Sequence, residues 1–232
     1  MPTALVTGAS RGIGRAIARR LAATHDILAV ARSAGDLRTL AEEIDAAGGR
    51  CRPLALDVAD GDAVARTLEG LEADVVVNNA GVGVLKPLLE LAPDEWRRMV
   101  DVNLTALYHV TRALLPGMVA RESGHVVIIG SIAGRSAFVG GTCYAATKHA
   151  VMGFAESLML EVRDAGVRVT VVSPGSVATD FSPPRDRGGI DWQLRPEDVA
   201  ESVAHAVAAP AGVLVHRVEV RALSPKRPRR GS

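Results

Sequence analysis

The chain has 232 residues, 48% of them hydrophobic, and its 27 Lys and Arg nearly balance its 26 Asp and Glu, so no bulk charge calls for a nucleic-acid or membrane partner. Two cysteines cannot form a disulfide framework and suit a reducing compartment, which predicts a cytoplasmic protein with one sizeable core. The start lacks a signal peptide's basic region, and no apolar run approaches the ~20 residues that span a bilayer.

Short apolar runs alternate with stretches in which apolar residues recur at helical spacing, as at Ile13, Ile17 and Leu21. The runs predict strands at Thr3–Thr7, Asp26–Ala31, Cys51–Leu56, Val75–Val77, His125–Ile129, Val167–Val172 and Val213–Val220. The periodic stretches predict helices at Ile13–Thr24, Leu37–Ala47, Asp62–Leu71, Asp94–Arg121 (bent near Pro116), Thr142–Asp164 and Pro196–Ala208.

This alternation predicts an α/β fold. Most of the strands are apolar on both faces, which is typical of a doubly wound parallel sheet covered by helices on both sides, here with about seven strands. We expect one domain over residues 1–224 and a basic, flexible tail over residues 225–232. The run Lys226–Arg230 could contact nucleic acid, but a solvated terminus is the favoured interpretation.

A glycine-rich turn lies where the first strand meets the first helix. It holds Gly8, Gly12 and Gly14, with Ser10, Arg11 and Ile13 between them. Glycine lets the backbone turn sharply and lets a phosphate approach, while the helix N-terminus offers free N–H groups to an anion. The spacing differs from G-x-G-x-x-G, so a plain strand–helix turn is the alternative.

The residue after the second strand indicates which nicotinamide cofactor fits. An acidic side chain there would bind ribose hydroxyls, whereas arginine accommodates a 2′-phosphate. The strand ends at Arg32, and Arg11 could add a second guanidinium from the turn. The sequence therefore predicts NADP(H), unless Arg32 is only a solvated surface residue.

Tyr144 and Lys148 are four residues apart on a predicted helix and so share one face. To exchange protons near neutral pH, the pKa of a tyrosine must fall by roughly 3 units, and a nearby ammonium favours the phenolate. Lys148 is one of only three lysines in the chain. Ser131 follows a strand end, where a hydroxyl could bind a substrate oxygen.

Taken together, the motifs resemble those of the short-chain dehydrogenase/reductase family, in its one-domain, NADP-preferring branch with a Rossmann fold. The resemblance covers roughly Thr3 to Val220. In family order, its motifs are Thr7-Gly8-x-x-x-Gly12-x-Gly14, Asp57-Val58, Asn78-Asn79-Ala80-Gly81, Asn103, Ser131, Tyr144-x-x-x-Lys148 and Pro174-Gly175-x-Val177-x-Thr179.

The resemblance implies an oxidoreductase that moves a hydride between NADP(H) and a carbonyl or alcohol. Tyr144 would be the acid–base, Lys148 would lower its pKa and bond the nicotinamide ribose, and Ser131 would orient the substrate oxygen. Asn103 would hold a water that continues a proton path. The remaining cofactor contacts implied are Asp57 and Val58 at the adenine, Asn79, Ala80 and Gly81 at the ribose, and Pro174, Gly175, Val177 and Thr179 at the nicotinamide. The alternative is that several of these are ordinary turn residues.

The substrate is not encoded by these motifs. Val82, Ile132, Phe138, Val139 and Phe181 suggest a mainly apolar pocket for a small molecule, under a short mobile lid over residues 180–195. The resemblance also implies a homotetramer or homodimer. The six histidines show no zinc-ligand spacing, so no metal is expected. An NADP(H)-binding sensor or scaffold without turnover is the competing function.

Overall fold

The computed structural model describes residues 1–179, 181, 192–210 and 212–223. The tail predicted at 225–232, and most of the lid predicted at 180–195, lie outside the described residues. The strands are β1 Thr3–Thr7, β2 Asp26–Ala31, β3 Cys51–Ala55, β4 Val75–Asn78, β5 Gly124–Ile129, β6 Val167–Pro174 and β7 Arg217–Val220. The α-helices are α1 Gly12–Leu21, α2 Ala34–Ala46, α3 Gly61–Leu68, α4 Pro93–Val100, α5 Ala106–Ala120, α6 Thr142–Val162 and α7 Pro196–Val207.

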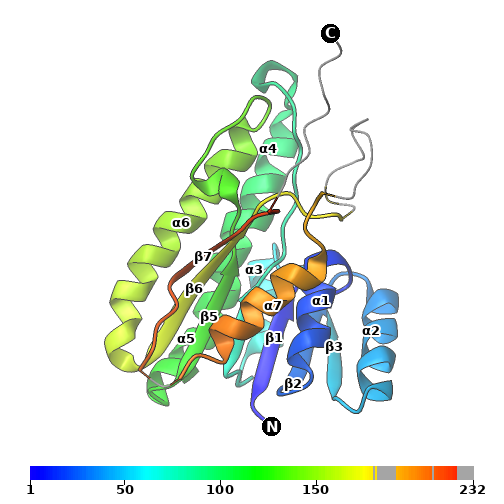
Figure 1. Ribbon diagram of the computed structural model, residues 1–232, viewed down its shortest axis with the longest axis vertical. Coiled ribbons are helices and arrows are strands. Elements are labelled where there is room, and N and C mark those ends of the chain that lie inside the picture. Colours follow the sequence, from blue (N-terminus) through cyan, green and yellow to red (C-terminus); the bar gives the residue numbers. More distant parts are fainter. Residues whose placement is uncertain (180, 182–191, 211, 224–232) are drawn as a thin grey trace.

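All the strands form one parallel sheet in the order β3-β2-β1-β4-β5-β6-β7. Helices cover both of its faces, with α1 and α7 in front of the strands in Figure 1 and α3 and α5 behind them. The predicted doubly wound α/β fold is thus confirmed. The strand order reverses between β1 and β4, and ligands of such sheets bind beyond the carboxyl ends of the strands at that point.

The two faces of the sheet bury separate cores. Along β1, Ala4 and Val6 face one cluster, which includes α1, α2 and α7, whereas Leu5 faces the cluster formed with α3, α5 and α6. Successive side chains of a strand point to opposite faces, so an all-apolar strand fills both cores at once. This two-sided burial fixes the strand ends on which the site is built.

Several predicted elements differ from the structure in their bounds, and three of these differences have a clear cause or consequence. The helix expected over Asp94–Arg121 is divided by a π-helical segment, Asp101–Thr105, and Pro116 lies within the continuous α5. The last strand begins at Arg217, since residues 213–216 precede the ladder. Helix α2 begins earlier than predicted, because the hydroxyl of Ser33 accepts a hydrogen bond from Asp36 N–H and caps it.

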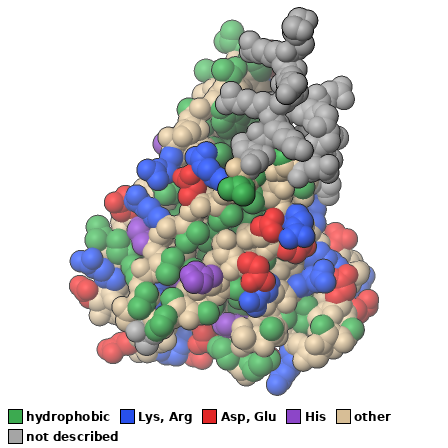
Figure 2. Space-filling model, in the orientation of Figure 1, with side chains coloured by type: hydrophobic (Ala, Val, Ile, Leu, Met, Phe, Trp, Pro, Cys, Tyr) green, Lys and Arg blue, Asp and Glu red, His purple; other side chains and the backbone are tan. Residues whose placement is uncertain are grey.

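Charged side chains of both signs are interspersed on the face shown in Figure 2. Several pair across elements, such as Arg20 of α1 with Glu201 of α7 at 2.6 Å. Such exposed pairs each contribute only about 0–1 kcal/mol to stability. Within the described ranges, no helix is both long and apolar enough to cross a membrane.

Candidate active site

The junction between β1 and α1 requires glycine at Gly8 and at Gly14. Gly8 has φ +66°, in the left-handed region, and a Cβ on Gly14 would lie 2.3 Å from the Gly8 carbonyl oxygen. The backbone of the turn is therefore packed directly on α1. No side chain caps the start of α1, and its first turn carries no acidic residue. These free N–H groups form a site suited to a phosphate.

The loops after β1 and β4 are held together by Thr7 and Asn79. The hydroxyl of Thr7 donates to Val77 O and accepts from the N–H groups of Asn79 and Ala80, each at 3.0 Å. The amide of Asn79 donates back to Thr7 O at 2.9 Å. Asn79 and Ala80 are thus placed beside the glycine turn, as the cofactor hypothesis requires. Thr7 was predicted only as part of the turn, and its role became visible only in the structure.

The predicted adenosine-binding residues lie at neighbouring strand ends. Arg11 and Arg32 are both exposed, the first in the turn and the second directly after β2. After β3, Asp57 is exposed and accepts a hydrogen bond from Ala59 N–H at 3.0 Å, while Val58 is buried in the core. Asp57 therefore supports the turn after β3, and its contact with adenine stays a prediction.

Tyr144 and Lys148 both lie on α6, and Ser131 ends the extended stretch after β5. Lys148 is 7% exposed, and its Nζ donates to Ile129 O at 2.9 Å and lies 5.9 Å from the centroid of the Tyr144 ring. The oxygen of Ser131 accepts from Ala133 N–H at 3.1 Å, which leaves the hydroxyl proton free to be donated. The three predicted catalytic side chains are thus brought into one region.

The pKa values in this region are set mainly by burial. Burial raises the pKa of Tyr144, opposed in part by a side-chain hydrogen bond with Ser131. Burial also lowers the pKa of Lys148 to about 8. Desolvation of the phenol dominates the shift in the pKa of Tyr144, and Lys148, whose ammonium is bonded to the Ile129 carbonyl, is not among its causes. That Lys148 lowers the pKa of Tyr144 therefore stays a prediction.

Asn103 lies in the π-helical segment and is 4% exposed. Its Oδ1 accepts from Val82 N–H at 2.8 Å, and its Nδ2 donates to Val82 O at 2.9 Å and to Thr147 Oγ1 at 3.1 Å. Both amide protons are thus used by the protein itself. Asn103 and Lys148 also line one small cavity, which is where the predicted water would have to lie.

Thr147 is a residue that sequence reasoning missed. It accepts from Asn103, and its hydroxyl donates to Tyr144 O at 2.8 Å, so it connects the loop at Val82 to the turn of α6 that carries Tyr144. The signal available in the sequence was a threonine within a predicted helix, since β-branched residues are disfavoured in helix interiors.

The segment after β6 closes the site on the side of the glycine turn. Gly175 N–H donates to Val220 O at 2.8 Å, and Val177 pairs with Leu194 in a parallel bridge. Beyond them, the side chain of Thr179 approaches Gly12, where an added Cβ would lie 3.3 Å away. Pro174, the last residue of β6, starts this segment. The predicted nicotinamide-side residues thus lead toward the turn.

The ring of Phe181 packs on Tyr144, with 5.7 Å between ring centroids, and fills the space above Gly83. Phe138 and Val139 are 42% and 95% exposed, an unusual exposure for such apolar side chains. Lys86 is paired with Glu95 at 2.5 Å. Phe181 is thus the apolar side chain that the structure places against Tyr144, and the apolar pocket around it stays a prediction. Cys143, beside Tyr144, is buried, and burial raises the pKa of its thiol, which fits a packing role.

Comparison with known proteins yields one family and a set of close relatives. Residues 2–188 match the model of the short chain dehydrogenase family. The chain is 37% identical, over 93% of both lengths, to the NADP-dependent 3-hydroxy acid dehydrogenase YdfG of Salmonella typhi. It is 38% identical to the 3-oxoacyl-[acyl-carrier-protein] reductase FabG of Vibrio harveyi, over 77% of this chain and 75% of the relative.

Among solved structures, a metagenomic short-chain oxidoreductase in complex with NADP superimposes with a TM-score of 0.85. It is 36% identical to this chain, and the match covers 97% of this chain and 98% of that one. The fold and the sequence motifs thus point to the same family.

Proposed function

The chain belongs to the short-chain dehydrogenase/reductase family, and from that premise we propose that it is an NADP(H)-dependent oxidoreductase acting on a carbonyl or alcohol. The observation that carries the proposal is the convergence of Ser131, Tyr144 and Lys148 near the carboxyl end of β5, at the same edge of the sheet as the glycine turn that follows β1. A module that only binds a nucleotide has no need of this trio.

The glycine turn fits the pyrophosphate of a dinucleotide, because Gly8 and Gly14 leave no Cβ in the way and α1 offers uncapped N–H groups. Arg11 and Arg32 are proposed to bind the 2′-phosphate of the adenosine ribose. When bound, the nicotinamide supplies or accepts the hydride. Ser10, Gly12, Ile13, Asp57, Val58, Asn79, Ala80, Gly81, Pro174, Gly175, Val177 and Thr179 are proposed to complete the cofactor site.

The proton chemistry is assigned to this chain's own side chains. Ser131 donates a hydrogen bond to the substrate oxygen, since its own oxygen is already bonded to Ala133 N–H. Tyr144 gives a proton to that oxygen in reduction and takes it back in oxidation. A phenol is protonated at neutral pH, which is the form that donates in reduction. The ammonium of Lys148 stabilises the phenolate left behind, and Asn103 is proposed to hold a water that resupplies the proton.

The substrate is proposed to be a small molecule with an apolar portion, accommodated near Phe181 and Phe138. A homodimer or homotetramer is also proposed, since Tyr108 and Leu160 on the long helices are 47% and 54% exposed. Light scattering of the purified chain measures the oligomeric state. A cytoplasmic location and the one-domain boundary at residue 224 stay predictions.

One experiment tests the function directly. The purified chain is incubated with NADPH and a panel of ketones, 3-oxo esters and 3-oxoacyl thioesters, and the loss of NADPH absorbance is followed. Substrate-dependent oxidation is expected for at least one carbonyl. A chain that binds NADPH tightly and oxidises it with no member of a broad panel would instead be the sensor or scaffold. Salt-dependent retention on DNA that needs residues 226–230 would favour the nucleic-acid alternative.

A further inference from the structure

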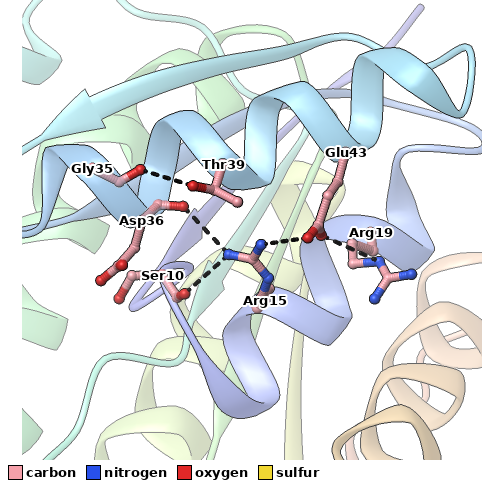
Figure 3. Close-up of polar contacts among 7 residues, drawn as sticks. All are labelled: Ser10, Arg15, Arg19, Gly35, Asp36, Thr39 and Glu43. Carbon is pink, nitrogen blue, oxygen red and sulfur yellow. Dashed lines mark hydrogen bonds and ion pairs between the residues drawn. The ribbon is translucent and has the colours of Figure 1, made fainter.

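Arg15, in the first turn of α1, contacts three acceptors in two parts of the structure, one in the glycine turn and two in α2 (Figure 3). Its Nη1 donates to Ser10 O at 3.2 Å and to Asp36 O at 3.3 Å, and its Nη2 donates to Glu43 Oε1 at 2.8 Å. The side chain is only 22% exposed. The planar guanidinium reaches these acceptors from two nitrogens held in a fixed fork, whereas a lysine ammonium has all three of its N–H donors on a single nitrogen.

The two backbone carbonyls that Arg15 bonds belong to the two segments that carry the exposed arginines of the proposed cofactor site. Ser10 directly precedes Arg11 in the glycine turn. On the other side, Asp36 N–H donates to the hydroxyl of Ser33, the residue after Arg32, at 3.4 Å. A continuous set of hydrogen bonds thus runs from one arginine-bearing segment, through Arg15, to the other.

The hydrogen bond from Arg15 to Ser10 O holds the glycine turn at its middle. The start of the turn is already tied to β2 by the Ala9 N–H, which donates to Val30 O at 3.1 Å. Arg15 adds the tie between the residue before Arg11 and the start of α2. Because exposed arginine side chains are long and mobile, the separation of their backbones decides whether both can contact one phosphate.

We propose that Arg15 is a positioning residue for NADP(H) selectivity, which holds the turn against α2 so that Arg11 and Arg32 reach the same 2′-phosphate. The inference rests on the proposed function, because it takes a 2′-phosphorylated adenosine as the ligand. Arg15 itself contacts backbone and Glu43, and acts through the other two arginines.

The test compares Arg15→Met with Arg19→Met. Arg19 lies one turn further along α1 and is 3.9 Å from the same Glu43, so its substitution removes the same charge while leaving both carbonyl contacts in place. Binding of adenosine 2′,5′-bisphosphate and of 5′-AMP is measured by calorimetry, and the KM for NADPH and NADH is measured with kcat. Thermal unfolding of every variant is recorded alongside.

Arg15→Met is expected to weaken binding of the 2′,5′-bisphosphate by about tenfold and that of 5′-AMP by less than about threefold. The KM for NADPH should rise in the same proportion, with kcat unchanged, and Arg19→Met should resemble wild type. Equal weakening of both nucleotides, or no weakening of either, overturns the proposal, since a merely structural role would not separate them. Wild type that binds both nucleotides equally overturns the NADP(H) assignment itself, and the positioning role with it.

Two milder variants keep the test decisive if Arg15→Met does not fold. Arg15→Lys retains the charge but lacks the two-nitrogen fork that spans the carbonyls and Glu43, so it should lose most of the preference for the 2′-phosphate. Glu43→Gln removes the ion pair and leaves the carbonyl contacts, so it should keep that preference. If Arg15→Lys instead kept the preference for the 2′-phosphate and Glu43→Gln lost it, the preference would depend on charge pairing with Glu43 and not on the link between the two segments.

Discussion

Two regions of the molecule are built on opposite principles. The nucleotide region, which comprises the glycine turn, α1 and the start of α2, carries its charges on exposed side chains such as Arg11 and Arg32. The catalytic region comprises Ser131, Asn103 and α6 from Tyr144 to Lys148. Its ionisable side chains, Tyr144 and Lys148, are largely withdrawn from solvent, and desolvation displaces their pKa values. An exposed guanidinium can bind an anion without being desolvated in advance. A buried group instead has its protonation equilibrium changed by the fold.

The comparison predicts where substitutions act. Changes in the nucleotide region should alter cofactor affinity and leave turnover intact, whereas changes in the catalytic region should alter turnover or stability and leave affinity intact. The following variants test that division, beginning with the one expected to have the largest effect.

Tyr144→Phe removes the proposed acid–base and keeps the ring that packs on Phe181. Turnover should fall by ~10³-fold, because proton transfer in the transition state is lost, while NADPH affinity stays within a few fold. Initial rates with the best carbonyl measure the first quantity, and fluorescence titration with NADPH the second. Residual activity above about a tenth of wild type would reject Tyr144 as the acid–base.

Lys148→Met tests whether the buried amine is costly to stability. The pKa of Lys148 is about 8 in the fold, against 10.5 for an unperturbed lysine. Between these two values the unfolded chain holds one proton more, so wild type gains stability as the pH rises from about 8 to about 10.5. Relative to Lys148→Met, the gain should approach about 3 kcal/mol.

Urea unfolding of wild type and Lys148→Met at neutral pH and near pH ~10 measures this difference. Since all other groups titrate alike in both proteins, the comparison isolates the lysine. A stability difference that does not change with pH would mean that Lys148 is not desolvated as the structure indicates.

Arg32→Asp tests whether the nucleotide region selects NADPH over NADH. The carboxylate should repel a 2′-phosphate and accept hydrogen bonds from ribose hydroxyls, so the ratio of kcat/KM for NADPH over NADH should fall by ~10- to 100-fold. The ratio is measured at saturating carbonyl. A wild-type preference for NADH would contradict the cofactor assignment at once, and an unchanged ratio in the variant would remove Arg32 from the site.

Asn103→Leu should have the smallest effect, and it should fall mainly on stability. Three hydrogen bonds are lost, and both backbone groups of Val82 lose their partner, so unfolding free energy should drop by about 2 kcal/mol. Denaturant midpoints measure the loss. If the melting behaviour is unchanged and turnover alone collapses, Asn103 acts in proton transfer more than in holding the loop at Val82.

The predicted elements and sites differed in how well the sequence alone located them. Apolar runs located the inner strands closely, because burial on both faces leaves a continuous apolar pattern, whereas the partly exposed edge strand β7 begins four residues later than predicted. The break in the predicted long helix was missed, since Pro116 was the visible signal and the actual irregularity serves Asn103. Thr147 and Arg15 were missed for a related reason: their partners are distant in sequence and become neighbours only in the folded chain.

The sequence by itself determined the fold class and the side chains proposed to react, because periodicity and residue chemistry are local properties. Only the tertiary structure decided the direction in which the pKa values of those side chains are displaced. The ammonium of Lys148 is bonded to the carbonyl of Ile129, and the pKa of Tyr144 rises where proximity along the helix alone suggested a fall. Desolvation depends on what the whole fold packs around a group, and no spacing between residues contains that information.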